Sequence, residues 1–301
     1  MFFETIFLLD IITSKKVCPQ IFFNKINHEK IKIGDKVYRN KLFSILMILI
    51  IVVFTVTDIV HASQLKETII YEVEQFTSVP GFSKTLTYEQ NVQSFLDFLR
   101  PIIKSENSYI MHDRIKLINL ITSLEKGNLD VDDINWINNK AIYYKLYNFS
   151  YTSKEDLSYL LTRIDVIPEL MVISQAAIES AYGTSGFAKR ANNLFGMRTM
   201  SQSRGIIPKK RSEGAKFYVA KYETVNQSIE CYLRNLNTHN AYYDLRKNRK
   251  DFRETNEPVD AYTLANGLTK YSAEGDIYVQ KIRRTMKKHE NSLDEDIPNK
   301  I

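Results

Sequence analysis

The chain has 301 residues, 44% hydrophobic and 25% charged, an ordinary composition for a globular protein of one large or two small domains. Its net charge is +6, but residues 1–62 hold 8 of the 41 basic and 5 of the 35 acidic side chains, so the rest carries only +3. This mild charge, without zinc-finger spacing or an aromatic-basic repeat, argues against a nucleic-acid partner. With only two cysteines, Cys18 and Cys231, a disulfide framework is excluded.

Residues 1–62 are predicted to form a leader. A 15-residue apolar run at 42–56 follows a basic flank at 36–41 and precedes a small-residue site before Ser63. This pattern is typical of a secretory signal peptide, and the run is shorter than the roughly 20 apolar residues of a membrane span. We therefore expect a periplasmic or secreted protein. The alternative is an inner-membrane anchor, in which this segment stays uncleaved and is the protein's one contact with a membrane.

Residues 63–150 are predicted to form a helical extension. Apolar residues recur there at three- and four-residue intervals, and Pro101 and Gly127 are expected to bend or end the helices. We expect the apolar faces to be buried as core behind the segment that follows. The three apolar faces are Val92, Phe95, Leu96, Leu99 and Ile103; Ile115, Ile118, Ile121 and Leu124; and Val131, Ile134, Ile137, Ala141 and Ile142.

The helix expected at residues 167–183 is nearly wholly apolar. Pro168 suits its first turn, and Gly183 and Gly186 lie where it should stop. Its one carboxylate near the C-terminal end is Glu179, next to Ile178. An apolar setting at the negative end of the helix dipole favours the neutral acid, which makes Glu179 a candidate proton donor. A glutamate that turns into solvent at a frayed helix end is the alternative.

The helices on either side of this segment have their own signals. Ser153 is the expected N-cap of a helix that continues through Ile164. Alternating residues within 204–221 predict a short β-hairpin, and Thr224 with Gln227 predicts a capping box that opens the next helix. Further helices are expected at 237–254, 261–267 and 274–290, before an acidic tail at 291–301. The predicted fold is mainly α, of the α+β kind, with a small hairpin.

The residues around Glu179 also carry a resemblance to a known family. A-x-x-E-S-A-Y-G-T-S followed by N-N-L-F-G resembles the catalytic stretch of glycoside hydrolase family 73, the peptidoglycan-cleaving N-acetylglucosaminidases. The resemblance covers residues 71–289 and includes the long, Bax-type form, whose helical region precedes this helix. T-K-Y-S-A-E-G-D-I-Y is similar to the family's Y-A-T-D-x-x-Y stretch. The resemblance implies a lysozyme-like glucosaminidase domain at 151–290, preceded by the extension at 63–150.

The resemblance also implies roles for particular residues. Glu179 would be the general acid and Tyr271 would lie near the reaction centre, with Tyr278 as packing. For the second catalytic group we favour Glu213, at the hairpin tip, over Glu223. A sugar's own acetamido oxygen is the alternative to a second carboxylate. Expected substrate-binding residues are Tyr182, where the family usually has tryptophan, Asn193, Phe195, Gly196 and Tyr222.

The function implied is hydrolysis of peptidoglycan strands by a monomeric endo-β-N-acetylglucosaminidase that needs no metal or cofactor. The five histidines are scattered, and no H-E-x-x-H, P-loop, G-x-G-x-x-G or G-x-S-x-G motif occurs. Two alternatives stay open. A lytic transglycosylase would use the same lone acid, and a glycan-binding or assembly protein could keep the fold without turnover.

Overall fold

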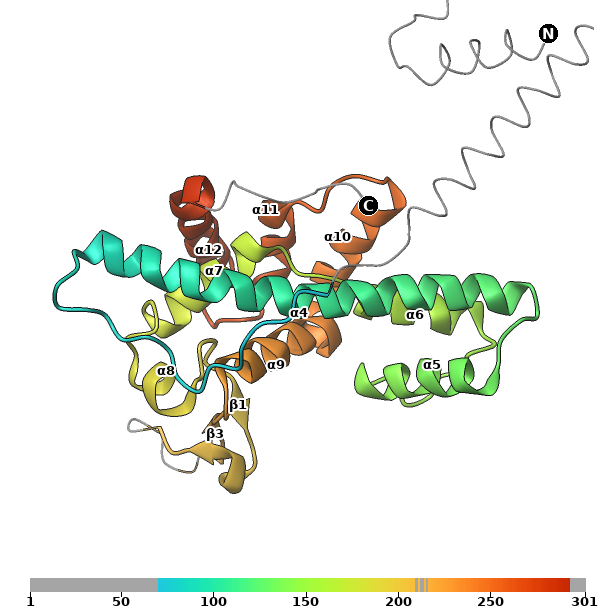
Figure 1. Cartoon of the computed structure of the whole chain (residues 1–301), viewed down its shortest axis with the longest axis horizontal. Helices are drawn as coiled ribbons and strands as arrows, with labels where there is room; N and C mark the ends of the chain where they lie inside the picture. The colour runs from blue at the N-terminus through green and yellow to red at the C-terminus, as the bar shows by residue number, and fades with distance from the viewer. Residues whose placement is uncertain (1–69, 209–210, 212–213, 215, 293–301) are drawn as a thin grey trace, which may run out of the picture. The chain divides into compact units, whose positions relative to one another are not determined.

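The computed structural model describes residues 70–208, 211, 214 and 216–292, and Figure 1 shows their arrangement. The predicted leader at 1–62 lies outside this range, as do the last nine residues of the chain. Within the described part, every helix is too short or too polar to cross a membrane. The mainly helical, lysozyme-like fold with one small sheet is as the sequence predicts.

The longest element is α4, Tyr88–Glu125, which crosses the molecule in Figure 1. The Thr87 side chain accepts from the Gln90 N–H while the Gln90 side chain accepts from the Thr87 N–H, a complete capping box. The helix continues through Pro101, and the two apolar faces expected at 92–103 and 115–124 belong to this one helix. In the second half, Leu117 and Leu120 are the buried apolar residues, and the predicted Ile118 is only half-buried.

Two shorter helices, α5 at Val131–Tyr143 and α6 at Lys154–Arg163, pack with the second half of α4 around a small core of their own. Ser153 caps α6 as predicted, accepting from the Asp156 N–H. On α5 the predicted apolar face is only partly core: Ile137 and Ala141 are buried, but Val131 is 71% exposed. Ile142, next to the buried Ala141, was also predicted on this face and is 57% exposed. The prediction was wrong for Val131 and Ile142 because tertiary contacts cover only part of this short helix.

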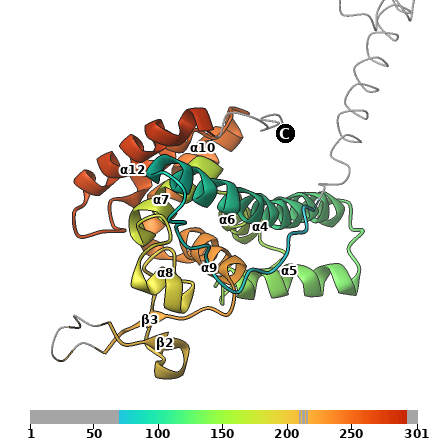
Figure 2. The same ribbon diagram turned by 60° about the vertical axis from the view of Figure 1, so that its left-hand side comes forward.

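The central helix is α7, Glu169–Ser180, which packs against both α4 and α12 (Figures 1 and 2). Because it is covered on several sides, seven consecutive residues from Met171 to Ala177 are buried. It ends at Ser180, earlier than the predicted stop at Gly183, because Ala181 and Tyr182 already adopt left-handed backbone angles. The short helix α8, Gly186–Ala191, follows.

A three-stranded antiparallel sheet follows α8, in the order β1-β3-β2. The strands are β1 (Arg198–Thr199), β2 (Gly205–Ile206) and β3 (Tyr218–Ala220), and a 3-10 turn at Gln202–Arg204 separates the first two. Strands β2 and β3 confirm the predicted hairpin, whereas the two-residue β1 has no periodicity that a sequence could show. Gly205 faces Ala220, and a Cβ at Gly205 would lie 2.5 Å from the Tyr218 Cβ, so the strands need glycine there.

The C-terminal third is helical and completes the main core around α7. Thr224 caps α9 by accepting from the Gln227 N–H, but the Gln227 side chain accepts from the Glu223 N–H, one residue earlier than a capping box requires. The elements are α9 (Val225–Thr238), a 3-10 turn (Asn240–Tyr242), α10 (Tyr243–Glu254), α11 (Ala261–Leu264), a second turn (Ala265–Leu268), α12 (Asp276–His289) and a last turn (Glu290–Ser292).

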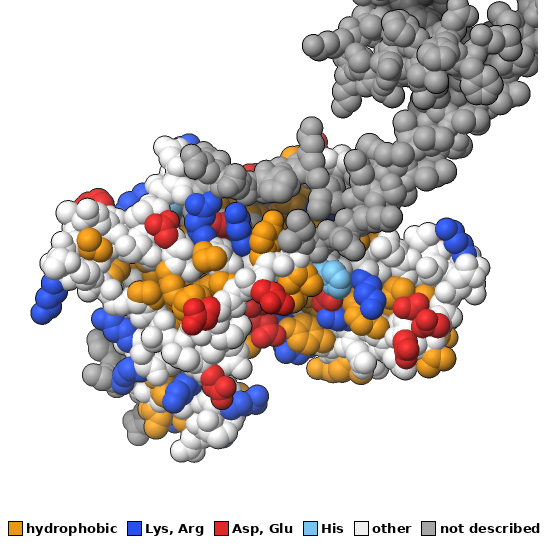
Figure 3. All heavy atoms as spheres, in the orientation of Figure 1, with side chains coloured by type: hydrophobic (Ala, Val, Ile, Leu, Met, Phe, Trp, Pro, Cys, Tyr) orange, Lys and Arg blue, Asp and Glu red, His pale blue; other side chains and the backbone are white. Residues whose placement is uncertain are grey.

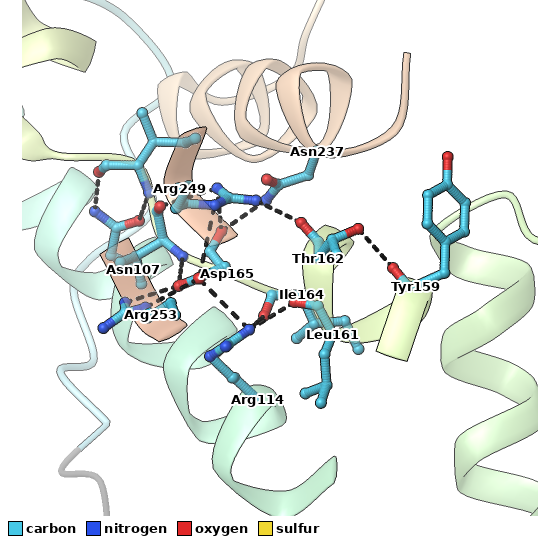
Figure 4. A network of polar contacts seen from close by, with 12 residues as sticks. Asn107, Arg114, Tyr159, Leu161, Thr162, Ile164, Asp165, Asn237, Arg249 and Arg253 are labelled. Carbon is cyan, nitrogen blue, oxygen red and sulfur yellow. Dashed lines mark hydrogen bonds and ion pairs between the residues drawn. The ribbon is translucent and has the colours of Figure 1, made fainter. Parts of the chain in front are cut away.

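The segment that leads into α7 is fixed by a buried ion cluster (Figure 4). Asp165 is only 2% exposed, and its carboxylate meets Arg114 of α4 at 3.4 Å, and Arg249 and Arg253 of α10 at 3.6 and 2.8 Å. Asn107 of α4 adds a pair of hydrogen bonds to the backbone of Ile167. The start of α7 is therefore tied to two other helices.

Candidate active site

Glu179 is the penultimate residue of α7. Its side chain is half-buried between α12 and the loop that follows α8. The Tyr278 hydroxyl, on α12, donates to its Oε1 at 2.7 Å. Its other oxygen, Oε2, faces Gly196, where an added Cβ would lie 3.5 Å away. Gly196 also has φ of +65°, so any side chain there would be strained and would crowd the acid. One carboxyl oxygen of Glu179 is thus fixed by a hydrogen bond, and the other faces the backbone of a glycine, which has no side chain.

The surroundings of Glu179 favour its protonated form. Burial raises the pKa of the carboxyl, and the negative charge of Glu274 adds to the rise, while the hydrogen bond from Tyr278 opposes it. No lysine or arginine makes an ion pair with Glu179 among the described residues. A carboxyl group with a raised pKa and no cation beside it keeps its proton to higher pH than a solvated glutamate does, which suits it to act as a proton donor.

A chain of buried hydrogen bonds ends at Glu179. The Tyr232 hydroxyl of α9 donates to the Gln175 side-chain oxygen, and the Gln175 amide donates to the Tyr278 oxygen at 3.0 Å. Tyr278 then donates to Glu179. Gln175 lies one helical turn before Glu179 on α7, so both side chains point to the same side of the helix. The chain fixes the direction of every donor and therefore the position of the carboxyl group.

The N-N-L-F-G loop supports the site through its backbone. The Asn193 amide donates to the Met197 and Ala220 carbonyl oxygens, both at 2.8 Å, and its oxygen accepts from the Met197 N–H at 3.0 Å. Asn193 is only 1% exposed, so its observed contacts hold the loop against β3. Asn192 anchors the same loop to the carbonyl of Thr77. These bonds place Gly196 beside the acid.

Two pairs of stacked aromatic rings support this loop. Phe195 is buried and stacks on Tyr232 with ring centroids 3.8 Å apart. The Tyr271 hydroxyl donates to the Phe195 carbonyl oxygen at 2.7 Å, and its ring stacks on Tyr278 at 5.4 Å. The structure therefore places Tyr271 near Glu179, as expected, but gives its hydroxyl a backbone partner. Direct sugar contacts by Phe195 and Tyr271 stay predictions.

The remaining predicted residues lie at different places. The Tyr182 ring packs edge-on against Phe95 and Tyr88, and its hydroxyl is 3.1 Å from His289 Nε2. Tyr222 is half-buried after β3, where its N–H donates to the Ala191 carbonyl. Glu213 lies outside the described residues. The substrate roles of Tyr182, Asn193, Gly196 and Tyr222, and the catalytic role of Glu213, stay predictions.

Tyr278, Gln175 and Tyr232 are the site residues that the sequence analysis missed or misjudged. Tyr278 was expected to be packing, and the structure corrects this because its hydroxyl contacts the acid. A signal for Gln175 existed, since it is a polar side chain four residues before Glu179 on an otherwise apolar helix. No local pattern points to Tyr232, which is 57 residues from Gln175 in the chain.

The described residues hold no cluster of three or more histidine, cysteine, aspartate or glutamate side chains that could bind a metal ion. What they assemble is one half-buried acid, oriented by tyrosine and glutamine. The fold and this acid together define a lysozyme-like domain of the glycosidase type. Such a site suits chemistry that begins with proton transfer to a leaving oxygen.

Comparison with known proteins supports this class and narrows it. A family model described as mannosyl-glycoprotein endo-β-N-acetylglucosaminidase matches residues 154–291. The chain is 33% identical over 202 residues to Protein bax of Escherichia coli (strain K12), a match that covers 67% of this chain and 71% of that protein. The chain therefore belongs to the Bax-type glucosaminidase family. No solved structure gives a significant match.

Proposed function

We propose that the protein is an endo-β-N-acetylglucosaminidase that hydrolyses the glycan strands of peptidoglycan, with Glu179 as the general acid. The observation that carries this proposal is the half-buried Glu179 carboxyl with its raised pKa, held at Oε1 by Tyr278. The matched family description supports the type of bond cleaved. The predicted leader supports an exported location, where peptidoglycan is found, and the protein would act as a monomer without a metal or cofactor.

In the proposed reaction, Glu179 donates its proton to the glycosidic oxygen as the bond between that oxygen and the anomeric carbon breaks. The sugar left behind carries positive charge at the anomeric carbon, and attack by a water oxygen at that carbon completes the hydrolysis. The protonated acid needs no cation beside it before the reaction. Afterwards, Tyr278 donates its hydrogen bond to the new carboxylate and limits the cost of forming a buried charge.

The second group has two candidates. Glu213 would accept the proton of the attacking water or stabilise the positive charge. Alternatively, the acetamido oxygen of the substrate would attack the anomeric carbon first, and Tyr271 would help to position it. Among the described residues, no second carboxylate contacts Glu179. This observation does not distinguish a hairpin carboxylate from substrate assistance. A site with a single carboxylate also fits a lytic transglycosylase.

Product analysis of digested peptidoglycan strands tests the proposal. Purified protein and its Glu179→Gln variant are incubated with the same strands, and the fragments are identified by mass spectrometry. We expect reducing N-acetylglucosamine ends from the wild type and almost none from the variant. Anhydro-muramic ends would show a lytic transglycosylase instead. Binding to the strands without any new ends would show a glycan-binding or assembly protein.

A further inference from the structure

A cavity of about 320 Å³ lies away from Glu179, between α4, α5 and α9. A neighbouring recess of about 280 Å³ shares two of its lining residues, Glu106 of α4 and Glu230 of α9. The volume of the first cavity is at the lower end of the range for small-ligand sites, roughly 300–1,000 Å³. Figure 3 shows acidic side chains on the face of the molecule that α4 crosses. None of the residues that surround Glu179 lines the cavity.

Two carboxylates dominate the cavity, and one of them has no partner. Glu230 accepts from the Tyr143 hydroxyl at 2.7 Å. Glu106 makes no hydrogen bond or ion pair with any residue that the structure describes, although it is largely covered. Burial and the nearby charge of Glu230 raise the pKa of Glu106 to about 7. An ionised Glu106 is therefore destabilised by its surroundings unless a positive charge enters.

The cavity's own cations are already engaged elsewhere. Lys140 of α5 pairs with Asp113 of α4. The Arg234 guanidinium lies 4.1 Å from the centre of the Tyr143 ring, and its Nε donates to the Tyr143 carbonyl at 3.0 Å. Neither forms an ion pair with Glu106 or Glu230 in the described structure. Neither glutamate therefore has a lysine or arginine partner within ion-pair distance among the described residues.

The remaining walls suit an alkyl chain that ends in a positive charge. Aromatic and aliphatic surface comes from two residues of α4, Tyr109 and Ile110, and from two at the end of α5, Tyr143 and the C-cap residue Tyr144. A cation close to a tyrosine face gains about 0.5–2 kcal/mol beyond any ion pair. Apart from Glu230, Arg234 and Asn237, the cavity is lined by the helices that precede the family match at 154–291. The extension therefore helps to build a second recess.

We propose that this cavity binds a primary ammonium group, held between the carboxylates of Glu106 and Glu230. An ammonium has three N–H donors, enough to bond both carboxylates at once. Its charge replaces the missing counterion of Glu106, and its alkyl stem packs against the tyrosines. The ammonium can belong to a peptide side chain or to a free amine. This inference does not depend on the proposed glycosidase activity.

Calorimetric titration of the full chain at pH 8 tests the proposal with three probes. Nα-acetyl-lysine amide carries the ammonium on a peptide unit, pentylamine carries it alone, and Nα-acetyl-norleucine amide lacks it. We expect the two ammonium probes to bind and the norleucine probe not to bind. Tighter binding of the lysine probe would identify a peptide as the source of the ammonium, and equal binding of pentylamine would identify a free amine.

Variants link binding to the cavity. Glu106→Gln should weaken the ammonium probes at least tenfold, whereas Glu257→Gln, an exposed control outside the cavity, should leave them unchanged. Because the ammonium favours the ionised carboxyl group, wild-type affinity should rise between pH 5.5 and pH 8, and Glu106→Gln should remove most of that rise. The Gln variant should fold, since it removes a like-charge repulsion, and circular dichroism checks this. Equal binding of the norleucine probe, unchanged affinity in Glu106→Gln, or no binding by any probe would overturn the proposal.

Discussion

Two covered carboxylates lie at opposite ends of α7, and their surroundings shift their pKa values in opposite directions. Asp165, just before the helix, faces Arg249, Arg114 and Arg253. Glu179, near the other end, meets a tyrosine hydroxyl and no cation among the described residues. Burial acts on both in the same direction, raising the pKa. At Asp165 the three arginines overcome burial and hold the pKa below its usual range, whereas at Glu179 the pKa stays raised.

This difference shows that the partners of a buried carboxyl group decide its role. An aspartate that stays ionised among arginines cannot donate a proton, so Asp165 serves to connect helices. Burial raises the pKa of Glu179, so this glutamate keeps its proton to higher pH than a solvated one and is suited to donating it. Both depend on the same helix, because Asp165 fixes where α7 begins and Glu179 lies where it ends.

The largest expected effect is the loss of activity in Glu179→Gln. The amide keeps the shape and the hydrogen bond from Tyr278 but cannot donate the proton, so turnover on glycan strands should fall by about 10²–10⁴-fold. Glu169→Gln, in the first turn of the same helix, is the matched control and should keep activity within about threefold. Retention of more than about a tenth of activity by Glu179→Gln would remove it from the acid role.

Asp165→Asn tests the other end of the helix. Three arginines lose their shared counter-charge, so the free energy of unfolding should fall by about 3 kcal/mol or more in urea titrations at pH 7. The pKa of Asp165 is lower in the folded chain than the unfolded value of about 3.9. Its contribution is therefore present above about pH 4 and is lost as the pH falls through the folded pKa.

Two measurements accompany this prediction. The stability gap between wild type and Asp165→Asn should begin to narrow below about pH 4 and should close further as the pH falls toward the lower folded pKa of Asp165, because the wild-type carboxyl then becomes neutral, as Asn is. Asp251→Asn, on α10, removes an exposed pair with Lys247 and should change stability by no more than about 0.5 kcal/mol. A gap that stays constant down to pH 2 would show that Asp165 does not act through its charge.

Glu213→Gln and Tyr271→Phe distinguish the two candidates for the group that opposes Glu179. If Glu213 stabilises the developing charge, its Gln variant should raise the activation free energy by about 2 kcal/mol or more with little change in substrate binding. If the substrate's acetamido group does so, Glu213→Gln should be mild and Tyr271→Phe severe. Both variants are assayed on the same purified strands, and a fully active Glu213→Gln protein would leave substrate assistance as the mechanism.

The smallest expected effect is that of Tyr278→Phe, which sharpens the electrostatic side of the comparison. Loss of the hydroxyl should lower kcat about tenfold, the effect of one hydrogen bond to a charged group. A general acid works only while protonated, so activity falls as the pH rises through its pKa. Because the Tyr278 hydrogen bond lowers the pKa of Glu179, removing it should move this fall to higher pH.

The pH profile of kcat/KM separates this role from a purely structural one. Tyr147→Phe, a change at a tyrosine that is 76% exposed, is the control and should keep both the rate and the profile of the wild type. A Tyr278→Phe protein with a reduced rate and an unmoved profile would show that the hydroxyl supports the fold alone and does not act on Glu179.

Features that depend on neighbouring residues could be predicted from the sequence. Ser153 and Thr224 cap their helices because a side-chain oxygen needs only an N–H three residues on, a geometry that any chain can form locally. The apolar pattern around Glu179 likewise predicted a covered helix with one acid near its end. The motif on either side of it indicated the family that the comparisons then showed.

Contacts between side chains across the core could not be predicted from the sequence, because they depend on how the helices pack. Tyr278 contacts Glu179, which is 99 residues away in the chain, and Gln175, which is 103 residues away. No spacing along the chain encodes such contacts. The same holds for the arginines around Asp165, which come from two helices. Packing also decided that α4 continues through Pro101 and that part of the apolar face of α5 stays exposed. Local patterns set the helices and the position of the acid along the chain, whereas long-range packing set the direction in which the pKa of each acid is shifted.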